Sequence, residues 1–352
     1  MLLIGIDEAG YGPRIGPLCH GYSAIRCRDE HAFPPDLWKL LHPSVMRVPG
    51  FDGSTVVDDS KKVHGAPGGK ELLARGVRAF LSCSAGHAAD PHGCLDDLYA
   101  RILPEHDRAR LEEDDWGAAH AQPEETAQPE SVDAAGELPA KKASSKSKRI
   151  SKSLAALGPA PEKIPPVHEA LSQNGITVVA VGARGLSAKH YNAVLRSGKN
   201  KADVNWSVIA EQFLKLIALA QPGEPVHAVI DRQGGRKFYA GKVGDLFPGS
   251  MPWTEVETPT TSVYRIEVDG RTVRVAFLVD ADGQSLTVAL GSMAAKLARE
   301  LCMKRLNDYF RKHEPHLKPT AGYYGDASRF LRETRGLRKK LNIPNAALIR
   351  LK

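Results

Sequence analysis

Short runs of apolar residues, bounded by glycine, proline or polar residues, occur at several places along the chain and predict β-strands. They occupy residues 2–6, 21–27, 176–182 and 226–230. A further segment, VYRIEVDGRTVRVAFLVD, has one apolar stretch on each side of Asp269-Gly270. Because Asp-Gly suits a tight type I′ turn, this segment is expected to form a β-hairpin.

Three longer segments have the period of an α-helix, at residues 70–81, 205–219 and 285–310. In the second, one apolar face is formed by Ile209, Phe213, Leu216, Ile217 and Ala220. The third is apolar in its first part and cationic towards its end. This mixture of strands and helices favours an α/β fold, with helices packed on the faces of a mixed sheet.

The segment 105–166 differs from the rest of the chain, since it contains mainly Ala, Pro, Glu, Ser and Lys. It begins acidic (EEDD) and becomes basic (KKASSKSKR). So few large apolar residues cannot offset the entropy of ordering the chain, and we expect a disordered insert. It is interpreted as a solvated linker, although its charge blocks could pair with each other or the basic block could contact nucleic acid. Residues 1–104 and 167–352 are then expected to form one domain.

Composition narrows the class of protein. The chain has 352 residues, of which 42% are hydrophobic, and a formal charge of +7, which permits a polyanionic partner. No apolar run is long enough to span a membrane, and no basic region precedes Leu2, so neither a membrane span nor a secretory signal is expected. An odd, scattered set of cysteines does not indicate a disulfide framework. The five cysteines are Cys19, Cys27, Cys83, Cys94 and Cys302. We therefore expect the protein to be located in the reducing cytoplasm, and we expect it to be a monomer.

Carboxylates follow three of the predicted strands. Asp7-Glu8 ends the first strand, Asp231 ends the fourth, and Asp280 and Asp282 follow the hairpin. Ligands of open α/β sheets gather at the carboxyl ends of strands, so these acids are expected to meet at one edge. Clustered carboxylates repel one another unless cations neutralise them, and oxygen ligands suit Mg²⁺ or Mn²⁺. Two such ions, about 4 Å apart, can activate water and stabilise the leaving oxygen of a phosphodiester.

Several motifs, which occur in the same order, resemble the type 2 ribonuclease H family. Those typical of the whole family are IGIDEAGYGPRIGPL, DDSKKV, DGQSLTVALGSMAAKLARE and AGYYGDA. Two others, SAKHYNAVL and VIDRQGGRKFY, are more similar to its type 3 branch. The resemblance extends over nearly the whole chain outside the segment 105–166.

The resemblance implies an RNase H-like fold with a C-terminal helical part at about residues 300–352. It also implies divalent-metal-dependent cleavage of the RNA strand of RNA–DNA hybrids, leaving 5′-phosphate and 3′-hydroxyl ends. The implied catalytic, metal-binding acids are Asp7, Glu8, Asp231 and Asp282. Asp280 is an alternative to Asp282, because a strand end could present either carboxylate.

The implied contacts with nucleic acid lie in three of these motifs. They are Gly10, Tyr11, Gly12, Ser60, Lys61, Lys62 and Tyr323. The family's Gly-Arg-Gly is Gly-Tyr-Gly here, so the charge of the arginine is missing, and a tyrosine only stacks or offers one hydroxyl. We therefore expect cleavage within RNA–DNA stretches to be favoured over cleavage at a single embedded ribonucleotide.

Three alternatives remain open from the sequence. Cys83, His87, His92 and Cys94 could form a tetrahedral zinc site, although their spacing is not that of a known zinc motif. The protein could be a nucleic-acid-binding relic that cuts poorly. It could also be a junction-type nuclease that prefers branched DNA.

Overall fold

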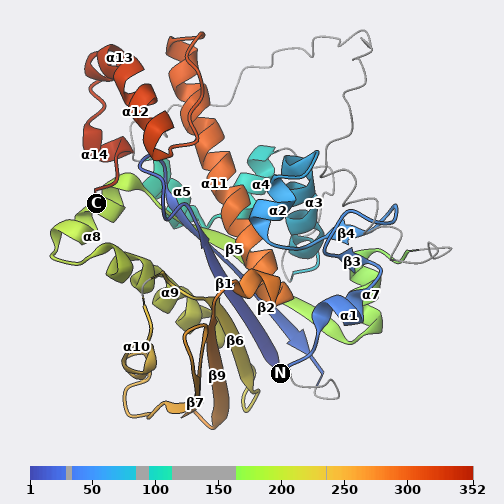
Figure 1. The fold of residues 1–352 in the computed structure, drawn as a ribbon. Helices are drawn as coiled ribbons and strands as arrows, with labels where there is room; N and C mark the ends of the chain where they lie inside the picture. Colours follow the sequence, from blue (N-terminus) through green and yellow to red (C-terminus); the bar gives the residue numbers. More distant parts are fainter. Residues whose placement is uncertain (29–33, 85–94, 113–163, 235, 352) are drawn as a thin grey trace.

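A seven-stranded mixed sheet forms the centre of the computed structural model, which describes residues 1–28, 34–84, 95–112, 164–234 and 236–351 (Figure 1). The strand order is β5-β2-β1-β6-β9-β8-β7. The strands are β1 (Leu2–Ala9), β2 (Leu18–Cys27), β5 (Ile176–Leu186), β6 (Val226–Asp231), β7 (Trp253–Glu257), β8 (Thr261–Val268) and β9 (Arg271–Leu278). A separate pair is formed by β3 (Val45–Met46) and β4 (Thr55–Val56).

The four predicted strands and the hairpin are confirmed. β1 is antiparallel to β2 and parallel to β6, which is itself parallel to β9. The hairpin joins β8 to β9 through Asp269 and Gly270, whose φ angles of 48° and 71° are both positive, as a type I′ turn requires. Because β1, β6 and β9 run in the same direction, their carboxyl ends lie at one edge of the sheet.

Helices cover both faces of the sheet, so the expected fold class is confirmed. On one face α11 (Leu286–His313) packs with α1 (Leu37–Leu41), α2 (Ser60–His64), α3 (Gly69–Leu81), α4 (Leu95–Ile102) and α7 (Val167–Gln173). On the other face lie α9 (Lys201–Ile217) and α10 (Ala240–Gly244), while α8 (Ala188–Arg196) packs against α9. No helix within these described ranges is long and apolar enough to cross a membrane.

β1 separates two hydrophobic cores by the alternation of its side chains. Leu3 belongs to the core beneath α11, whereas Ile4 and Ile6 belong to the core beneath α9. Gly5 faces α11, and a Cβ atom at this position would lie 2.1 Å from the backbone of Thr287. The missing side chain therefore lets the first turn of α11 lie directly on β1.

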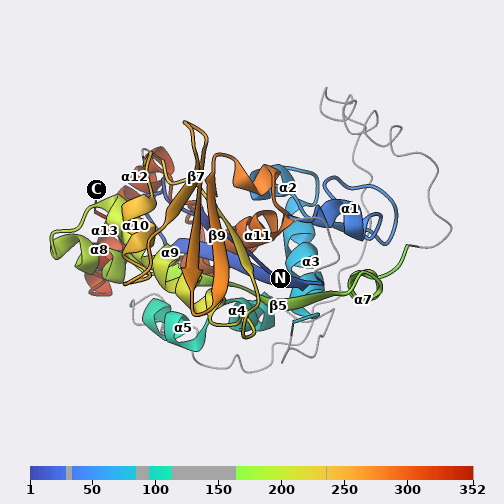
Figure 2. The same ribbon diagram turned by 90° about the horizontal axis from the view of Figure 1, so that it is seen from below.

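The C-terminal helices form a third, smaller core at one end of the molecule (Figures 1 and 2). They are the last turns of α11, then α12 (Tyr324–Glu333), α13 (Arg335–Lys340) and α14 (Asn345–Leu348). Since α11 runs continuously through residue 300, the sheet and the helical end share one helix. After α14 the chain returns to the N-terminal region, where Ile349 bridges Ile15.

The disordered insert was expected to begin at residue 105, but the first eight residues of that segment form a helix. This helix, α5 (Glu105–Glu112), packs against β5. Asp107 is 2% exposed and accepts hydrogen bonds from the side chain of Arg184 and the backbone of Gly185. Leu111 is buried in the core beneath α11. Glu112 also lies 3.9 Å from Arg305 of α11, so ion pairs at two positions and the buried Leu111 hold a helix whose composition is strongly polar. Residues 113–163 lie outside the described part of the chain.

Candidate metal centre and nucleic-acid site

Three of the predicted acids meet at the carboxyl edge of the sheet. One ligand atom from each of Asp7, Glu8 and Asp231 lies within 4.8 Å of the other two. Asp7 and Glu8 come from the end of β1 and Asp231 from the end of the adjacent parallel strand β6. The parallel pairing of two strands that are more than two hundred residues apart in the sequence therefore creates the cluster.

Asp7 and Glu8 are oriented by helices on opposite faces of the sheet. Successive side chains of a strand alternate between faces, so Asp7 lies on the side of α11 and Glu8 on the side of α9. Ser292 of α11 lies beside Asp7 and Asn205 of α9 lies beside Glu8, and each of these polar side chains favours the charged form of its neighbouring carboxylate and so lowers its pKa. Each carboxylate therefore has its own buried support.

Asn205 is itself fixed by a buried histidine. Its Oδ1 accepts a hydrogen bond from Nε2 of His20, and both residues are almost completely buried. Burial lowers the pKa of His20 to about 4, so the imidazole is neutral and its proton lies on Nε2. Because the amide oxygen of Asn205 accepts from His20, the group that Asn205 can offer to Glu8 is its NH₂ donor.

Burial and mutual repulsion raise the pKa values of all three acids. For Asp7, which is 8% exposed, burial is the main cause, followed by the charges of Glu8 and Asp231. Burial and the charge of Asp231 raise the pKa of Glu8 to about 7. Burial also raises the pKa of Asp231, although its Oδ1 accepts a hydrogen bond of 3.0 Å from the backbone of Ala281. The site thus favours a cation that would neutralise these charges.

Neither Asp282 nor Asp280 belongs to the three-acid cluster, and Asp282 is the more buried of the two. Asp282 is half-buried in the 3₁₀ turn η2 (Ala281–Gly283), and burial with the charges of Asp59 and Asp231 raises its pKa to about 6. Asp280 is exposed and has a left-handed backbone, with a φ of 53°. Both carboxylates act on the three-acid cluster, since Asp282 raises the pKa of Asp7 and Asp280 raises that of Asp231.

Lys61 faces the acids, whereas Lys62 does not. Burial opposes the charged form of Lys61, but Asp59, Asp7, Asp282 and Asp231 together raise its pKa. The ammonium of Lys62 instead lies 3.7 Å from Asp58 and 3.9 Å from Asp59.

Ser60, which lies in the same turn as the two lysines, is buried beside α11. Its hydroxyl oxygen is 3.0 Å from that of Ser292, the residue that also lies beside Asp7. The structure thus connects the DDSKKV segment to the metal-ligand candidates through one serine pair, and Ser60 is a support of the site rather than an exposed contact.

The Gly-Tyr-Gly loop lies between these acids and α9. Gly10 has a φ of 90°, a left-handed conformation that favours glycine, and a Cβ atom there would lie 2.8 Å from the side chain of Arg299. Gly12 is exposed and surrounded by open space. The ammonium of Lys201 lies 3.9 Å from the centre of the Tyr11 ring. Burial, followed by the charge of Glu8, raises the pKa of Tyr11, which therefore lies near the acids.

Tyr323 is 54% exposed and lies directly before α12. The backbone of Gly322 accepts hydrogen bonds from the amides of Arg14 and Ile15. The guanidinium of Arg14 lies 5.8 Å from the ring of Tyr324, which is also exposed. Two exposed tyrosines thus lie beside Arg14 and Ile15, which follow the Gly-Tyr-Gly loop in the sequence.

Of the possible zinc ligands, only Cys83 lies in the described part of the chain, where it is a free thiol that donates to the carbonyl of Ala79. His87, His92 and Cys94 lie outside the described residues. The zinc hypothesis therefore stays a prediction.

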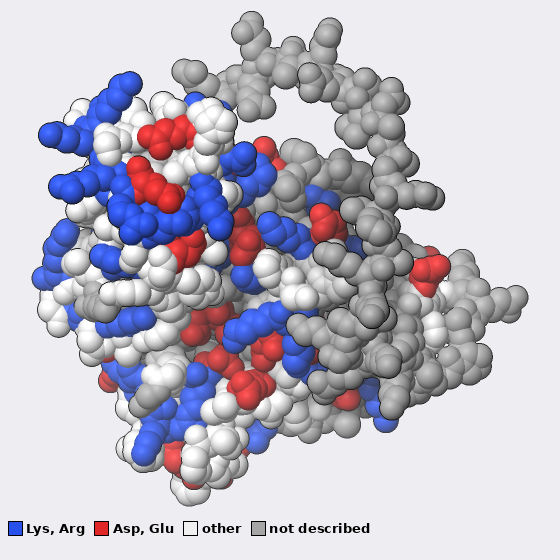
Figure 3. All heavy atoms as spheres, turned by 45° about the horizontal axis from the view of Figure 1, so that its top comes forward, with Lys and Arg blue, Asp and Glu red and all other residues white. Residues whose placement is uncertain are grey.

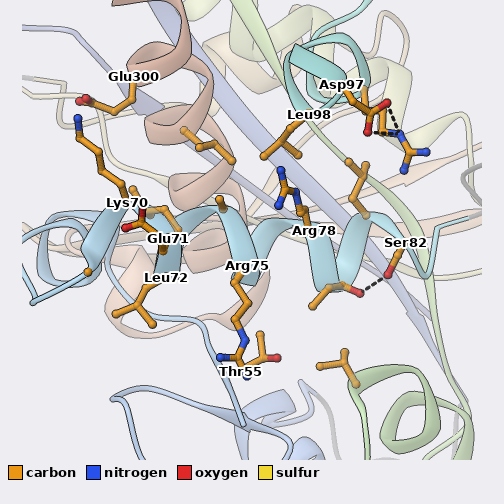
Figure 4. Close-up of a pocket in the computed structure, with 18 of the residues that line it drawn as sticks. Thr55, Lys70, Glu71, Leu72, Arg75, Arg78, Ser82, Asp97, Leu98 and Glu300 are labelled. Atoms are coloured by element: carbon orange, nitrogen blue, oxygen red, sulfur yellow. Dashed lines mark hydrogen bonds and ion pairs between the residues drawn. The ribbon is translucent and has the colours of Figure 1, made fainter. Parts of the chain in front are cut away.

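The surface around the site has both signs of charge. Figure 3 shows acidic side chains near the middle of one face, with lysine and arginine beside them and a further basic group over the C-terminal helices. A separate pocket of about 1150 Å³ lies between α3, α4 and α11 and is lined by Lys70, Arg75, Arg78 and Glu300 among others (Figure 4). None of the predicted catalytic or substrate-binding residues lines this pocket.

Sequence reasoning missed Asn205 and Asp59. Asn205 begins the apolar face of α9, four residues before Ile209, and a polar residue at a buried helical position was the available signal. Asp59 caps α2 by accepting a hydrogen bond from the amide of Lys61, and it also raises the pKa of Asp282. Its contribution to the site depends on how α2 is packed, which has no local signature.

Comparisons with known proteins find similarity in structure. The chain matches no protein-family model and no curated protein. It is similar to RNase HII in a PCNA:RNase HII complex from Archaeoglobus fulgidus, at 14% identity and a TM-score of 0.39, over 100% of this chain and 95% of that one. For Bst-RNase HIII in complex with Mn²⁺, the identity is 15% and the TM-score 0.38, over 100% of this chain and 66% of that one. For ribonuclease H2 from Pyrococcus horikoshii OT3, the identity is 12% and the TM-score 0.36, over 99% of this chain and 92% of that one. The chain thus spans about two thirds of the RNase HIII chain and is similar in structure to ribonucleases HII and HIII.

Proposed function

We propose that this protein is a divalent-metal-dependent endoribonuclease that hydrolyses the RNA strand of RNA–DNA hybrids and leaves 5′-phosphate and 3′-hydroxyl ends. The observation that carries the proposal is the meeting of Asp7, Glu8 and Asp231 at one sheet edge, with ligand atoms within 4.8 Å. The motifs that supply these acids occur in the order typical of type 2 ribonucleases H. We further propose that it acts as a monomer in the cytoplasm, in keeping with the free thiols of Cys19, Cys27 and Cys302.

The donor set fits Mg²⁺ or Mn²⁺. Three clustered carboxylates with raised pKa values need a cation, and Oε2 of Glu8 is buried without a hydrogen-bond partner among the described residues. Asp7, Glu8 and Asp231 would hold the metal, with Asp282 as the fourth acid and Asp280 as its alternative. When bound, two such ions supply an activated water and stabilise the leaving oxygen of the phosphodiester.

The protein's own residues prepare the site for a phosphodiester. Ser292 and Asn205 fix the two carboxylates of β1, so little reorganisation is needed when the site is loaded. Lys61 lies among the acids and becomes available to a phosphate oxygen when their charge is neutralised. The exposed ring of Tyr323 provides a surface on which a sugar or base can stack.

Cleavage of a labelled RNA–DNA duplex tests the proposal. We expect cleavage of the RNA strand with Mg²⁺ or Mn²⁺ and none after chelation, because the clustered acids alone cannot stabilise the developing negative charge. Mapping the product ends should give 5′-phosphates and 3′-hydroxyls. Salt-sensitive binding without cleavage would instead indicate a nucleic-acid-binding relic, and preferential cleavage of branched DNA would indicate a junction-type nuclease.

Substrate choice provides a second prediction, which concerns Tyr11. We expect a continuous RNA–DNA stretch to be cleaved at least about tenfold faster than a duplex with one embedded ribonucleotide, since the loop has no cationic side chain of its own at residue 11. Both substrates are assayed with one enzyme preparation at the same metal concentration. Equal rates on the two substrates would refute this prediction.

A further inference from the structure

The segment from Gly10 to Pro17 is held from inside the protein through its carbonyl groups. Arg350 donates from Nη2 to the carbonyls of both Gly10 and Pro13, and its backbone amide donates to Arg14 at 2.9 Å. Arg299 of α11 donates to the carbonyl of Pro17 at 3.0 Å. Arg299 also donates to the carbonyl of Ile15 at 3.4 Å, so five carbonyl groups of the segment accept hydrogen bonds from these two arginines.

The backbone amides of Tyr11 and Gly12 are not used in holding the loop. Within the described residues neither amide makes a hydrogen bond, and Gly12 is exposed with open space around it. A short stretch of backbone amides beside clustered acids and an exposed tyrosine can donate to a phosphate oxygen. Whether these amides can reach a phosphate oxygen depends on the conformation of the loop, which Arg350 holds in place.

Arg350 belongs to a strap at the C-terminal end, residues 345–351, that is anchored to α8. Asn192 donates from Nδ2 to the carbonyl of Ile349 at 2.8 Å and accepts at Oδ1 from the amide of Leu351 at 2.7 Å. The guanidinium of Arg350 lies 5.2 Å from the centre of the Tyr191 ring. The strap thus connects the Gly-Tyr-Gly loop to a helix that is otherwise distant from it in sequence.

The two guanidiniums also place positive charge behind the loop. Arg299 is 2% exposed and Arg350 is 4% exposed, and in the described part of the structure neither contacts a carboxylate. By contrast, the buried Arg184 is paired with Asp107. Buried positive charges without a counter-ion raise the local electrostatic potential, which favours an anion beside the loop.

We propose that Arg350 is a positioning residue, and that the strap holds the Gly-Tyr-Gly loop in the shape that presents the amides of Tyr11 and Gly12 to a phosphodiester of the nucleic acid. This inference rests on the proposed function for the identity of the ligand. The positioning itself is a property of the protein alone, so it can be measured without catalysis.

Two variants of the full chain test the strap from different sides. Arg350→Met removes the donors to Gly10 and Pro13, whereas Asn192→Ala releases the strap from α8 and leaves the loop contacts in place. We expect each to raise KM for a hybrid about tenfold while kcat and the Mn²⁺ concentration for half-maximal rate change less than threefold, because the metal ligands are untouched. Arg350→Lys, which keeps one donor group, should recover part of the loss.

The matched control is Arg26→Met at the opposite end of β2. Arg26 pairs with Glu224 and donates to the carbonyl of Leu219, so its loss should lower the melting temperature without changing KM. Hydrogen–deuterium exchange of residues 9–17 gives a readout independent of activity. We expect faster exchange in both strap variants and unchanged exchange in Arg26→Met.

Different results would overturn the proposed nuclease function and the positioning role of Arg350. If the wild-type protein does not cleave hybrids but the strap variants exchange faster, the proposed function falls and the positioning stands. If exchange in the loop is the same in wild type and both strap variants, or if KM is unchanged in an active enzyme, the positioning role is overturned.

Discussion

Replacing Asp7 by asparagine is expected to reduce hybrid cleavage by at least about a thousandfold, which corresponds to roughly 4 kcal/mol of transition-state stabilisation. Asp7 lies at the centre of the acids, since its carboxylate interacts with Glu8, Asp231 and Asp282. Asparagine keeps the size of the side chain and its place beside Ser292, but it removes the charge and one oxygen ligand. The measurement is the single-turnover cleavage rate with saturating Mn²⁺.

Binding and a neighbouring acid provide the controls for this variant. Binding of the hybrid should stay within a few fold of wild type, because the contacts with the nucleic-acid backbone are unchanged. Asp280→Asn, which alters an exposed acid at the same edge, should stay close to wild-type activity, whereas Asp282→Asn should not. Retained activity in Asp7→Asn would count against the whole site. If activity were lost in Asp280→Asn but kept in Asp282→Asn, then Asp280 rather than Asp282 would be the fourth acid.

The second large effect concerns stability without metal. Burial raises the pKa of Glu8 from 4.5 to about 7 and that of Asp282 to about 6, so both groups bind protons more tightly in the folded than in the unfolded protein. Their contribution to stability is therefore fully present below about pH 4 and is lost as the pH rises to 7. For Glu8 alone the change corresponds to roughly 3 kcal/mol.

A divalent ion should reverse this loss, because it binds the deprotonated acids of the folded state. In thermal melts we expect millimolar Mn²⁺ to raise the melting temperature by about 5 °C at pH 8 and by much less at pH 5. Asp7→Asn should melt higher than wild type at pH 8 in a chelator, since it relieves repulsion, and should lose most of the metal-induced shift. An equal metal-induced shift at both pH values would be inconsistent with a site made of these acids.

The amino-acid sequence by itself determined the main elements and the chemistry of the edge. Strands β1, β2, β5 and β6, the hairpin at Asp269-Gly270 and the helices α3, α9 and α11 have local apolar periods, which are visible without any partner. The same pattern placed Asp7, Glu8 and Asp231 at strand ends, and the direction of parallel strands predicted that they would meet.

Only the tertiary structure decided which residues surround these acids. Asn205 and His20 support Glu8, Asp59 and Lys61 lie near the acids, and Arg350 donates to the carbonyl of Gly10. Each of these contacts joins segments from different parts of the chain. The helix α5 likewise depends on the distant Arg184, so its local composition was misleading. The physical reason is that periodicity reports which face of an element is apolar, whereas a buried polar contact depends on the packing of elements whose relative positions have no local signal.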